Sequence, residues 1–296
     1  MSNVAAEMAV KNARAHDITD PQRPRSRRNW VFIFATAWLI IVFVVVALGR
    51  WLPFIDDPTE KNAQAISQGP SWDHWFGTAT FGQDVFARVV EGGRISLFVG
   101  AMVTFIGIFV GGLLGLLAGY LRGWVDSLVR LLISVTLSIP ALLLVIFIVS
   151  IRGQSLTNVI LAVSLLAIPA LARIVRASTL QVADRDYVKA AQVLGVKKGS
   201  ILVREVLPNV MPTLVSFAFL TFGIILVAES SLSFLGLSVE SPTITWGSII
   251  AEGRIKFSDT PHMVFIPGAV LFLTVLSLNF VGDQLLKRFD IKESGL

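Results

Sequence analysis

One charged stretch decides the fold: Tyr187-Val188-Lys189-Ala190-Ala191-Gln192-Val193-Leu194-Gly195-Val196-Lys197-Lys198-Gly199-Ser200, which runs on to Leu207-Pro208-Asn209. It lies between long apolar segments. From Arg173 to Glu205, ten of 33 residues carry a charge. A segment with this density of charge cannot lie in hydrocarbon and must project into water.

The residue types of this stretch predict two short helices around a bend. Asp184 or Asp186 can cap the first helix, because a carboxylate accepts hydrogen bonds from the unpaired amides at a helix start. Gly195 suits the left-handed residue that ends this helix. Ser200 can cap the second helix, and Pro208 fits the first turn of the next long apolar helix.

Two small residues give the first helix a flat face. On Ala190 and Ala191 the backbone of a partner could come close, so we interpret the stretch as a docking element. A DNA-reading helix-turn-helix has a similar pattern of alanines and glycine. That motif needs a soluble three-helix core, whereas apolar spans flank this stretch on both sides. A nucleic-acid partner is therefore not expected.

The composition is that of a membrane protein. Of the 296 residues, 54% are hydrophobic and 15% charged, and the mean hydropathy is +0.73; soluble domains carry about 25% charged residues. The net charge of +5 therefore does not by itself indicate nucleic acid. Cysteine is absent, which excludes disulfides, a thiolate nucleophile and a cysteine-ligated metal. The three histidines, His16, His74 and His262, are scattered, so we expect no metal site.

Six uncharged apolar runs reach the length that spans a bilayer, about 20 residues (range roughly 17–25). They are Val31–Gly49, Ile95–Leu121, Leu131–Ile151, Ser155–Ala172, Val206–Ala228 and Met263–Gly282. The first run is longer than the core of a signal peptide, which has roughly 7–15 residues, and no small-residue cleavage site follows it. We therefore expect an uncleaved first span. The fourth run would extend to Val175 if Arg173 reaches towards the interface.

The distribution of lysine and arginine predicts the orientation. With the N-terminus inside, the inner segments hold 18 of these residues and the outer segments 7. This asymmetry favours cytoplasmic N- and C-termini and a cytoplasmic docking stretch. The expected division is a cytoplasmic tail (1–29), a first transmembrane helix (30–50), an extracytoplasmic loop (51–94), a five-helix core (95–286) that includes the cytoplasmic loop 184–208, and a C-terminal cytoplasmic tail (287–296).

Glycines recur every four residues along the second apolar run, at Gly107, Gly111, Gly115 and Gly119. Such a stripe lets another helix approach to backbone contact. The second helix can belong to this chain or to a sister subunit. Ordinary internal packing explains the stripe as well as a functional seam does.

The docking stretch resembles the coupling loop of binding-protein-dependent ABC import permeases, with two alanines, three residues, a glycine and, after eleven more residues, Leu207-Pro208. In that family the loop lies in a groove on a cytoplasmic ATPase subunit and carries its motion to the membrane. Lys189 departs from the family's usual glutamate, and Glu205 from a usual apolar residue. The resemblance implies that the ATPase is contacted by Tyr187, Lys189, Ala190, Ala191, Gly195, Val196, Leu207, Pro208 and Asn209.

Other parts of the chain resemble the peptide branch of the same family. The predicted outer loop matches its pattern at Gly77, Thr78, Gly82, Asp84, Arg88 and Arg94. Ala79 and Gln83 depart from it. After the fifth run, the chain matches at Glu229-Ser230-Ser231-Leu232-Ser233-Phe234-Leu235-Gly236-Leu237, Pro242 and Trp246-Gly247, and around the last run at Pro267-Gly268 and Asn279-x-x-Gly282-Asp283. The short apolar pieces of the segment that starts at Glu229 are expected along the outer surface.

Glu229 is the candidate for an outer gate or transport pathway, together with Ser230 and Phe234, because it stands at the outer end of the fifth run. A carboxylate that sits at the membrane interface in water explains the same position equally well.

The chain carries no energy source of its own. None of its 23 glycines precedes a lysine, so it lacks the Gly-Lys-Ser/Thr loop that cradles phosphates. The six runs also lack the ionisable residues that ion-driven carriers place at membrane depth. No esterase or zinc-protease motif occurs. We therefore expect no catalytic residue and no directly bound cofactor, with ATP and magnesium held by partner ATPases.

Together these features predict an all-α membrane protein whose six transmembrane helices form the permease bundle of a type I ABC importer for di- and oligopeptides. The resemblance implies a homologous permease subunit, two cytoplasmic ATPases, an extracytoplasmic substrate-binding protein and membrane lipid as partners, in the plasma membrane of a prokaryote. Two alternatives stay open. One is the same machine with nickel chelates or oligosaccharides as cargo, and the other is an ATP-independent channel or scaffold in which 187–208 is a plain connector.

Overall fold

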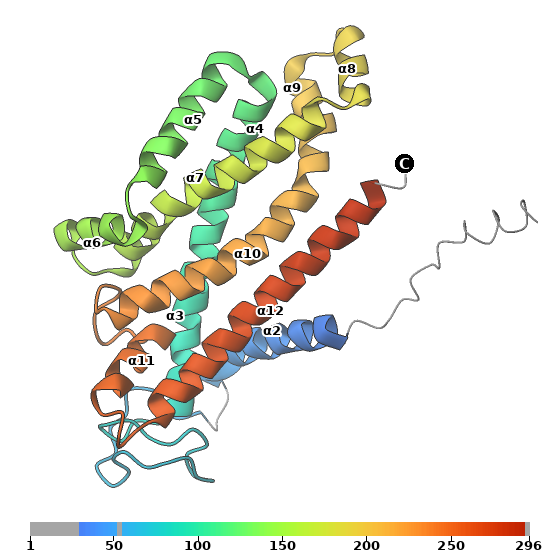
Figure 1. Ribbon diagram of the computed structural model, residues 1–296. Helices are drawn as coiled ribbons and strands as arrows, with labels where there is room; N and C mark the ends of the chain where they lie inside the picture. Colours follow the sequence, from blue (N-terminus) through green and yellow to red (C-terminus); the bar gives the residue numbers. More distant parts are fainter. Residues whose placement is uncertain (1–29, 52–54, 294–296) are drawn as a thin grey trace, which may run out of the picture.

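The computed structural model describes residues 30–51 and 55–293, and their regular structure is helical apart from one isolated bridge between Thr78 and Asp84 (Figure 1). The predicted N-terminal tail, 1–29, lies outside the described residues. The elements are, in order, α2 (Trp30–Leu48), η1 (Gly49–Trp51), α3 (Val85–Ile106), η2 (Gly107–Gly111), α4 (Gly112–Leu121), α5 (Gly123–Ser138), α6 (Ala141–Arg152), α7 (Leu156–Ala183), α8 (Asp186–Val193), α9 (Lys198–Ile201), η3 (Leu202–Val206), α10 (Leu207–Phe234), α11 (Trp246–Ile255) and α12 (His262–Glu293).

Five helical segments of the described chain are long and apolar enough to cross a membrane: Trp30–Leu48, Val85–Leu121, Leu156–Ala183, Lys198–Phe234 and His262–Arg288. A sixth span exists only as the bent pair α5 and α6, which meet at 82°. The single helix predicted over Leu131–Ile151 is therefore wrong. Pro140 is the reason, because proline disfavours helical backbone in the residue before it, and Ile139 is extended, with φ −83° and ψ 127°.

Three other predicted boundaries move as well. α3 begins at Val85, inside the predicted outer loop, because Asp84 caps it. α7 continues past Val175 to Ala183, since its last turns keep a buried face. α12 runs on to Glu293, so most of the predicted C-terminal tail is helical.

The predicted break before the fifth span is also absent. α9, η3 and α10 form one helical segment from Lys198 to Phe234, and the predicted cap at Ser200 is wrong because Lys197 precedes the first helical residue. A proline inside a helix clashes with the carbonyl group four residues earlier. The residues ahead of Pro208 adopt the wider π-helical geometry, which accommodates the ring.

The glycine stripe packs η2 and α4 against α7 of the same chain. A methyl group added at Gly115 would lie 2.5 Å from the carbonyl oxygen of Ala172 and 2.9 Å from the amide nitrogen of Arg176. The other glycines of the stripe face α7 too: Gly107, Gly111 and Gly119. The sequence left open whether the stripe contacts a helix of this chain or of a sister subunit. The structure shows the contact within this chain.

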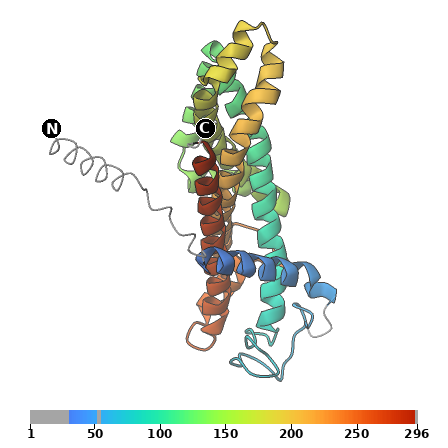
Figure 2. The same cartoon turned by 90° about the vertical axis from the view of Figure 1, so that its right-hand side faces the viewer.

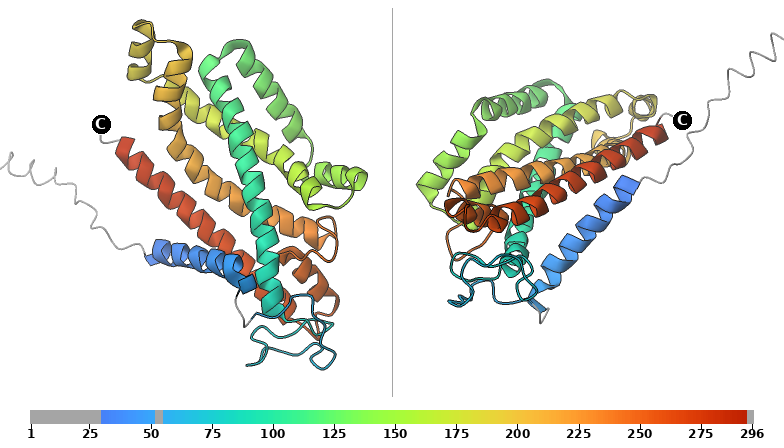
Figure 3. Two further views of the ribbon diagram at one scale, coloured as in Figure 1. Left: turned by 180° about the vertical axis from the view of Figure 1, so that it is seen from behind. Right: turned by 60° about the horizontal axis from the view of Figure 1, so that its bottom comes forward.

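The long helices run between two ends of the molecule. Figures 1 and 3 place α8 and α9 at one end, which we call the α8 end, and the loop before α3 at the other, the loop end. α2 lies across this direction (Figure 2), and Trp38 Nε1 donates a hydrogen bond to Thr274 Oγ1 of α12 at 3.2 Å. Near the loop end, Leu226, Trp246 and Met263 form part of one buried apolar cluster.

Candidate functional site

At the α8 end, one buried residue fixes α8 to the bundle and one glycine ends it. Val188 is completely buried and packs in an apolar cluster with Ile201, which we call the Val188 cluster. The left-handed conformation predicted for Gly195 is confirmed by its φ of +75°. The amide of Val196 then donates to the Ala191 carbonyl oxygen at 3.1 Å. α8 is therefore tied to the helix that follows it.

Neither aspartate caps α8 as predicted. Asp184 ends α7 instead and accepts a hydrogen bond from Arg122 Nη2 at 2.7 Å. Arg185 stands at the N-cap of α8 without a side-chain capping bond, and Asp186 is the first helical residue. There its charge suits the positive end of the helix dipole.

The tip of α8 presents bulky apolar side chains to solvent. Val193 is 88% exposed and Leu194 82%. An exposed apolar patch indicates a contact with a partner. Ala190 is exposed as predicted, whereas Ala191 is partly covered by the Val188 cluster. Neither bulky residue was among the predicted contacts, although an apolar pair on the far side of a short helix from Val188 was a usable signal.

The other residues predicted to contact an ATPase fall into two groups. Leu207 packs against the Val188 cluster, as Ala191 does. The exposed ones are Tyr187, Lys189, Val196, Pro208 and Asn209. Of these, Pro208 and Asn209 continue the long helix, where Asn209 Nδ2 donates to the Glu205 carbonyl oxygen at 2.6 Å.

At the loop end, Glu229 is the centre of a hydrogen-bond network. Its Oε2 accepts from Ser96 Oγ at 3.0 Å, and its Oε1 accepts from Ser233 Oγ at 2.8 Å and from Ser238 Oγ at 3.2 Å. Ser96 Oγ in turn accepts the amide of Trp246 at 3.2 Å. We call these five residues the Glu229 hub. It joins α3, α10, the segment after α10 and the start of α11.

The burial of Glu229 corrects one of the two sequence interpretations. A carboxylate in water is wrong, because the whole residue is buried. Hydroxyl groups of the same chain surround it, and its role in an outer gate or transport pathway stays a prediction. Burying a carboxylate is costly unless hydrogen bonds compensate, and the hub supplies them. Ser230 beside it is buried, and the Phe234 ring lies 4.5 Å from the Arg254 guanidinium.

α11, which the sequence placed along the outer surface, is folded into the core. Trp246 and Ile249 are completely buried. Trp246 Nε1 donates to the Val89 carbonyl oxygen of α3 at 2.8 Å. Thr245 and Ser248 cap the helix start reciprocally. The indole therefore packs this short helix against α3, while its place along the outer membrane surface stays a prediction.

The signature residues of the predicted outer loop pin it to the helices. Gly77 and Gly82 have left-handed φ values of +76° and +79°. The carbonyl oxygen of Thr78 lies 2.9 Å from His262 Nε2 of α12. Asp84 Oδ1 accepts the amide of Ala87 at 2.8 Å and so caps α3.

The two signature arginines differ in what they join. Arg88 is buried and binds Glu252 of α11 through two contacts, Nη2 to Oε2 at 2.5 Å and Nη1 to Oε1 at 3.2 Å. Arg94 binds Glu91 within α3 at 3.2 Å. Arg88 therefore links two helices, and Arg94 stabilises one.

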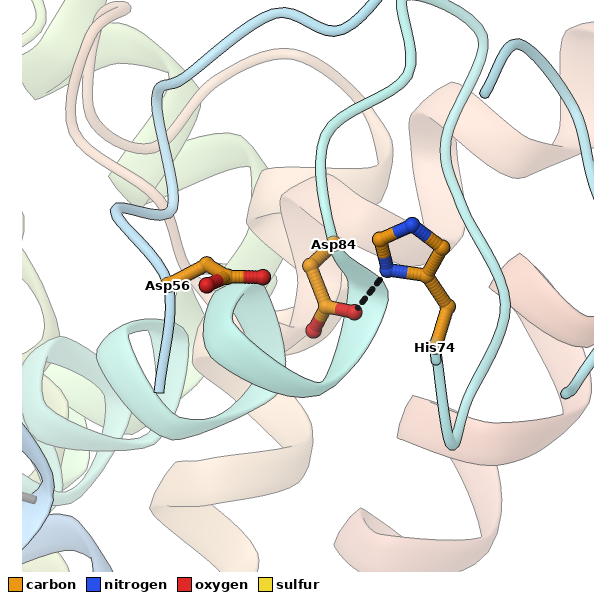
Figure 4. Close-up of side chains that lie close together, drawn as sticks. All are labelled: Asp56, His74 and Asp84. Carbon is orange, nitrogen blue, oxygen red and sulfur yellow. Dashed lines mark hydrogen bonds and ion pairs between the residues drawn. The ribbon is translucent and has the colours of Figure 1, made fainter. Parts of the chain in front are cut away.

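Asp56, His74 and Asp84 lie together at this end (Figure 4), and each offers one potential metal-ligand atom within 4.8 Å of the others. His74 is thus less isolated than its place in the sequence indicates. Its Nδ1 lies 2.9 Å from Asp84 Oδ2, while the other oxygen of Asp84 holds the start of α3. Pairing and capping account for these two residues, and the expectation of no metal stays a prediction.

The chain is similar to known transport proteins. Residues 111–293 match the family described as "Binding-protein-dependent transport system inner membrane component". The chain is 38% identical over 271 residues to the glutathione transport system permease protein GsiD of Shigella flexneri serotype 5b (strain 8401), and the match covers 92% of this chain and 89% of that one. The corresponding protein of Escherichia coli O157:H7 matches to the same extent.

The fold has solved counterparts. Two crystal forms of the MetNI methionine ABC transporter in inward facing conformations match with TM-scores of 0.54 and 0.55, at 19% and 18% identity. They cover 68% and 69% of this chain and 96% and 97% of those chains. The predicted bundle of a type I importer permease is confirmed. The chain belongs to the family of inner-membrane components of binding-protein-dependent transport systems, as a permease subunit of a type I ABC importer.

Proposed function

We propose that this permease carries di- or oligopeptides delivered by a substrate-binding protein, and that α8 is its contact with a cytoplasmic ATPase. The observation that carries the contact is the tip of α8, where Val193 and Leu194 stand in solvent while Val188 anchors the same helix in the bundle. Covering an aliphatic side chain of this size contributes about 1.5–3 kcal/mol. A groove that took both would bind α8 firmly.

The cargo proposal rests on the relatives and on the sequence. The relatives with 38% identity are named as glutathione permeases, and glutathione is a tripeptide. The loop-end signature and the segment from Glu229 to Leu237 resemble the peptide branch. Nickel chelates and oligosaccharides are the competing cargoes, and uptake measured with each class of compound separates them.

The mechanism follows from how α8 is attached. A push on α8 passes through Val188 and Ile201 into the long helix that begins at Lys198. ATP and magnesium are held by two partner ATPases, and a homologous permease completes the pathway. The α8 end faces the cytoplasm and the loop end faces outwards, as the excess of lysine and arginine favours.

The test places a charge on the proposed contact. Leu194→Arg should abolish ATP-driven peptide uptake in proteoliposomes and the co-purification of ATPase subunits. Gln181→Arg adds the same side chain at an exposed position near the end of α7, and it should leave both intact. Wild-type uptake by Leu194→Arg at normal abundance contradicts the contact, and uptake without ATP indicates a channel.

A further inference from the structure

A cavity of about 500 Å³ lies at the α8 end, between the α4–α5 junction, the end of α7 and α8. Its lining carries three cationic side chains, Arg122, Lys189 and Lys198, and one carboxylate, Asp184. We propose that it binds a phosphate group, that of an anionic phospholipid headgroup. The proposal needs a chain embedded in a membrane and does not depend on contact between α8 and an ATPase.

The charges of the lining are unbalanced. Arg122 and Asp184 neutralise each other through the 2.7 Å contact between Nη2 and Oδ1. Lys189 and Lys198 are exposed, and neither forms an ion pair within the part of the chain that the structure describes. Two ammonium groups that line one cavity without a counter-charge favour the entry of an anion.

A turn and an ion pair shape the Arg122 side of the cavity. Arg122 joins α4 to α5 with φ +56° and ψ −161°, a conformation that few residues other than glycine adopt. Its side chain pairs with Asp184 at the end of α7. This pair places the Arg122 charge at the wall, although a half-exposed pair adds little stability by itself.

A helix start adds positive potential to the other wall. Lys198 is the first residue of the 37-residue helical segment, and Lys197 at its N-cap makes no side-chain capping bond. The first amides of a helix have no helical acceptor, and the dipole favours an anion there. A Cβ placed on Gly199 would meet nothing within 4 Å, so this helix start is open to approach.

The surroundings of the cavity favour a lipid over a partner protein as the source of the anion. Leu121 of the lining is 46% exposed, and Trp124 just beyond it is 77% exposed. Tryptophan at such a position is typical of the headgroup layer, and basic pockets between helices on the cytoplasmic side bind anionic headgroups. Tyr120 also lines the cavity, and its buried hydroxyl has no hydrogen-bond partner among the described residues.

The experiment titrates the purified full chain in detergent with phosphatidylglycerol or phosphatidylcholine and counts bound lipid by native mass spectrometry. Lys189→Gln/Lys198→Gln should bind phosphatidylglycerol about 25-fold more weakly, because each basic residue contributes roughly a factor of five. Lys189→Arg/Lys198→Arg should restore the affinity. Lys61→Gln/Lys256→Gln removes the same charge at the loop end and should leave the affinity within about twofold of wild type.

Three results would overturn the proposal. The first is equal affinity of the wild type and the Lys189→Gln/Lys198→Gln variant for phosphatidylglycerol. The second is displacement of the lipid by millimolar inorganic phosphate, which would assign the cavity to a soluble anion. The third is displacement by the purified ATPase, which would assign it to a protein. Retention of the lipid by Leu194→Arg, with ATPase binding lost, would support the lipid site and show that it is separate from the coupling contact.

Discussion

Replacing Gly115 by alanine tests how closely α4 approaches α7. The added methyl group would lie 2.5 Å from the carbonyl oxygen of Ala172 and 2.9 Å from both the amide nitrogen of Arg176 and Cβ of Val175. Close carbon–oxygen contacts in proteins are about 3.3–3.6 Å. Because two of these three atoms belong to the backbone, no side-chain rotation relieves the clash, and the helices must separate.

The magnitude combines two opposed effects. Overpacking a tight contact costs about 1–3 kcal/mol. The cost at Gly115 lies near the upper end of this range, because two of the three opposing atoms belong to the backbone. Alanine offsets about 1 kcal/mol of this, because it forms helix better than glycine. The expected loss in the free energy of unfolding is therefore about 2 kcal/mol, which lowers the unfolding midpoint by about 4–8 °C.

Thermal unfolding of the purified chain in detergent, followed by circular dichroism, measures this loss. Gly268→Ala is the matched control, because Gly268 also lies within a helix of the membrane region and a Cβ there would meet nothing within 4 Å. Its midpoint should hold or rise. A wild-type midpoint for Gly115→Ala would refute the close approach and return the stripe to a contact with a sister subunit.

Substitutions at three further positions test other contacts. Glu229→Ala should lower the free energy of unfolding by about 3–5 kcal/mol, because it leaves the serine hydroxyls of the Glu229 hub without their acceptor and opens a cavity. Glu229→Gln keeps one acceptor oxygen and should lower it less. Equal unfolding midpoints for the two variants would contradict the hub. Arg88→Ala leaves the partly exposed Glu252 carboxylate without its partner and should cost about 1–3 kcal/mol in the same thermal assay; an unchanged midpoint would mean that the pair does not form. Gly195→Ala puts a side chain at φ +75° and should destabilise α8 locally by about 1–2 kcal/mol, measured as faster amide hydrogen exchange in α8; wild-type exchange rates there would exclude the left-handed turn.

Hydropathy predicts the spans well because burial in a bilayer depends on a property averaged over about 20 residues. It misses features that depend on one residue. The run Leu131–Ile151 is apolar throughout, yet Pro140 breaks it, and the signal was the proline rather than the hydropathy. α7 extends beyond its apolar run because buried contacts with α4 maintain the helix where charged residues appear on its other faces.

The candidate site also has features that a local sequence pattern predicts and features that depend on residues far apart in the chain. The conformation of Gly195 could be predicted, because the need for a left-handed residue is local. The burial of Glu229 could not, because one of its three donors, Ser96, lies 133 residues away and is brought there by the packing of α3 on α10. A short apolar segment such as Trp246–Ile255 has the same pattern on a surface as in a core, so its place between α3 and α12 needed the structure.

The uninterrupted helix from Lys198 to Phe234 also sets the scale on which movement is passed on. Its 37 residues follow a path about 55 Å long, and Figures 1 and 3 show that this path bends between α9 and α10. α10 alone has 28 residues and a length of about 42 Å. The π-helical turn at Leu202–Val206 directly precedes α10, so the whole of α10 lies beyond it. Under the proposed coupling, a tilt of α10 by about 5° around its start would move the end that carries Glu229 by about 4 Å.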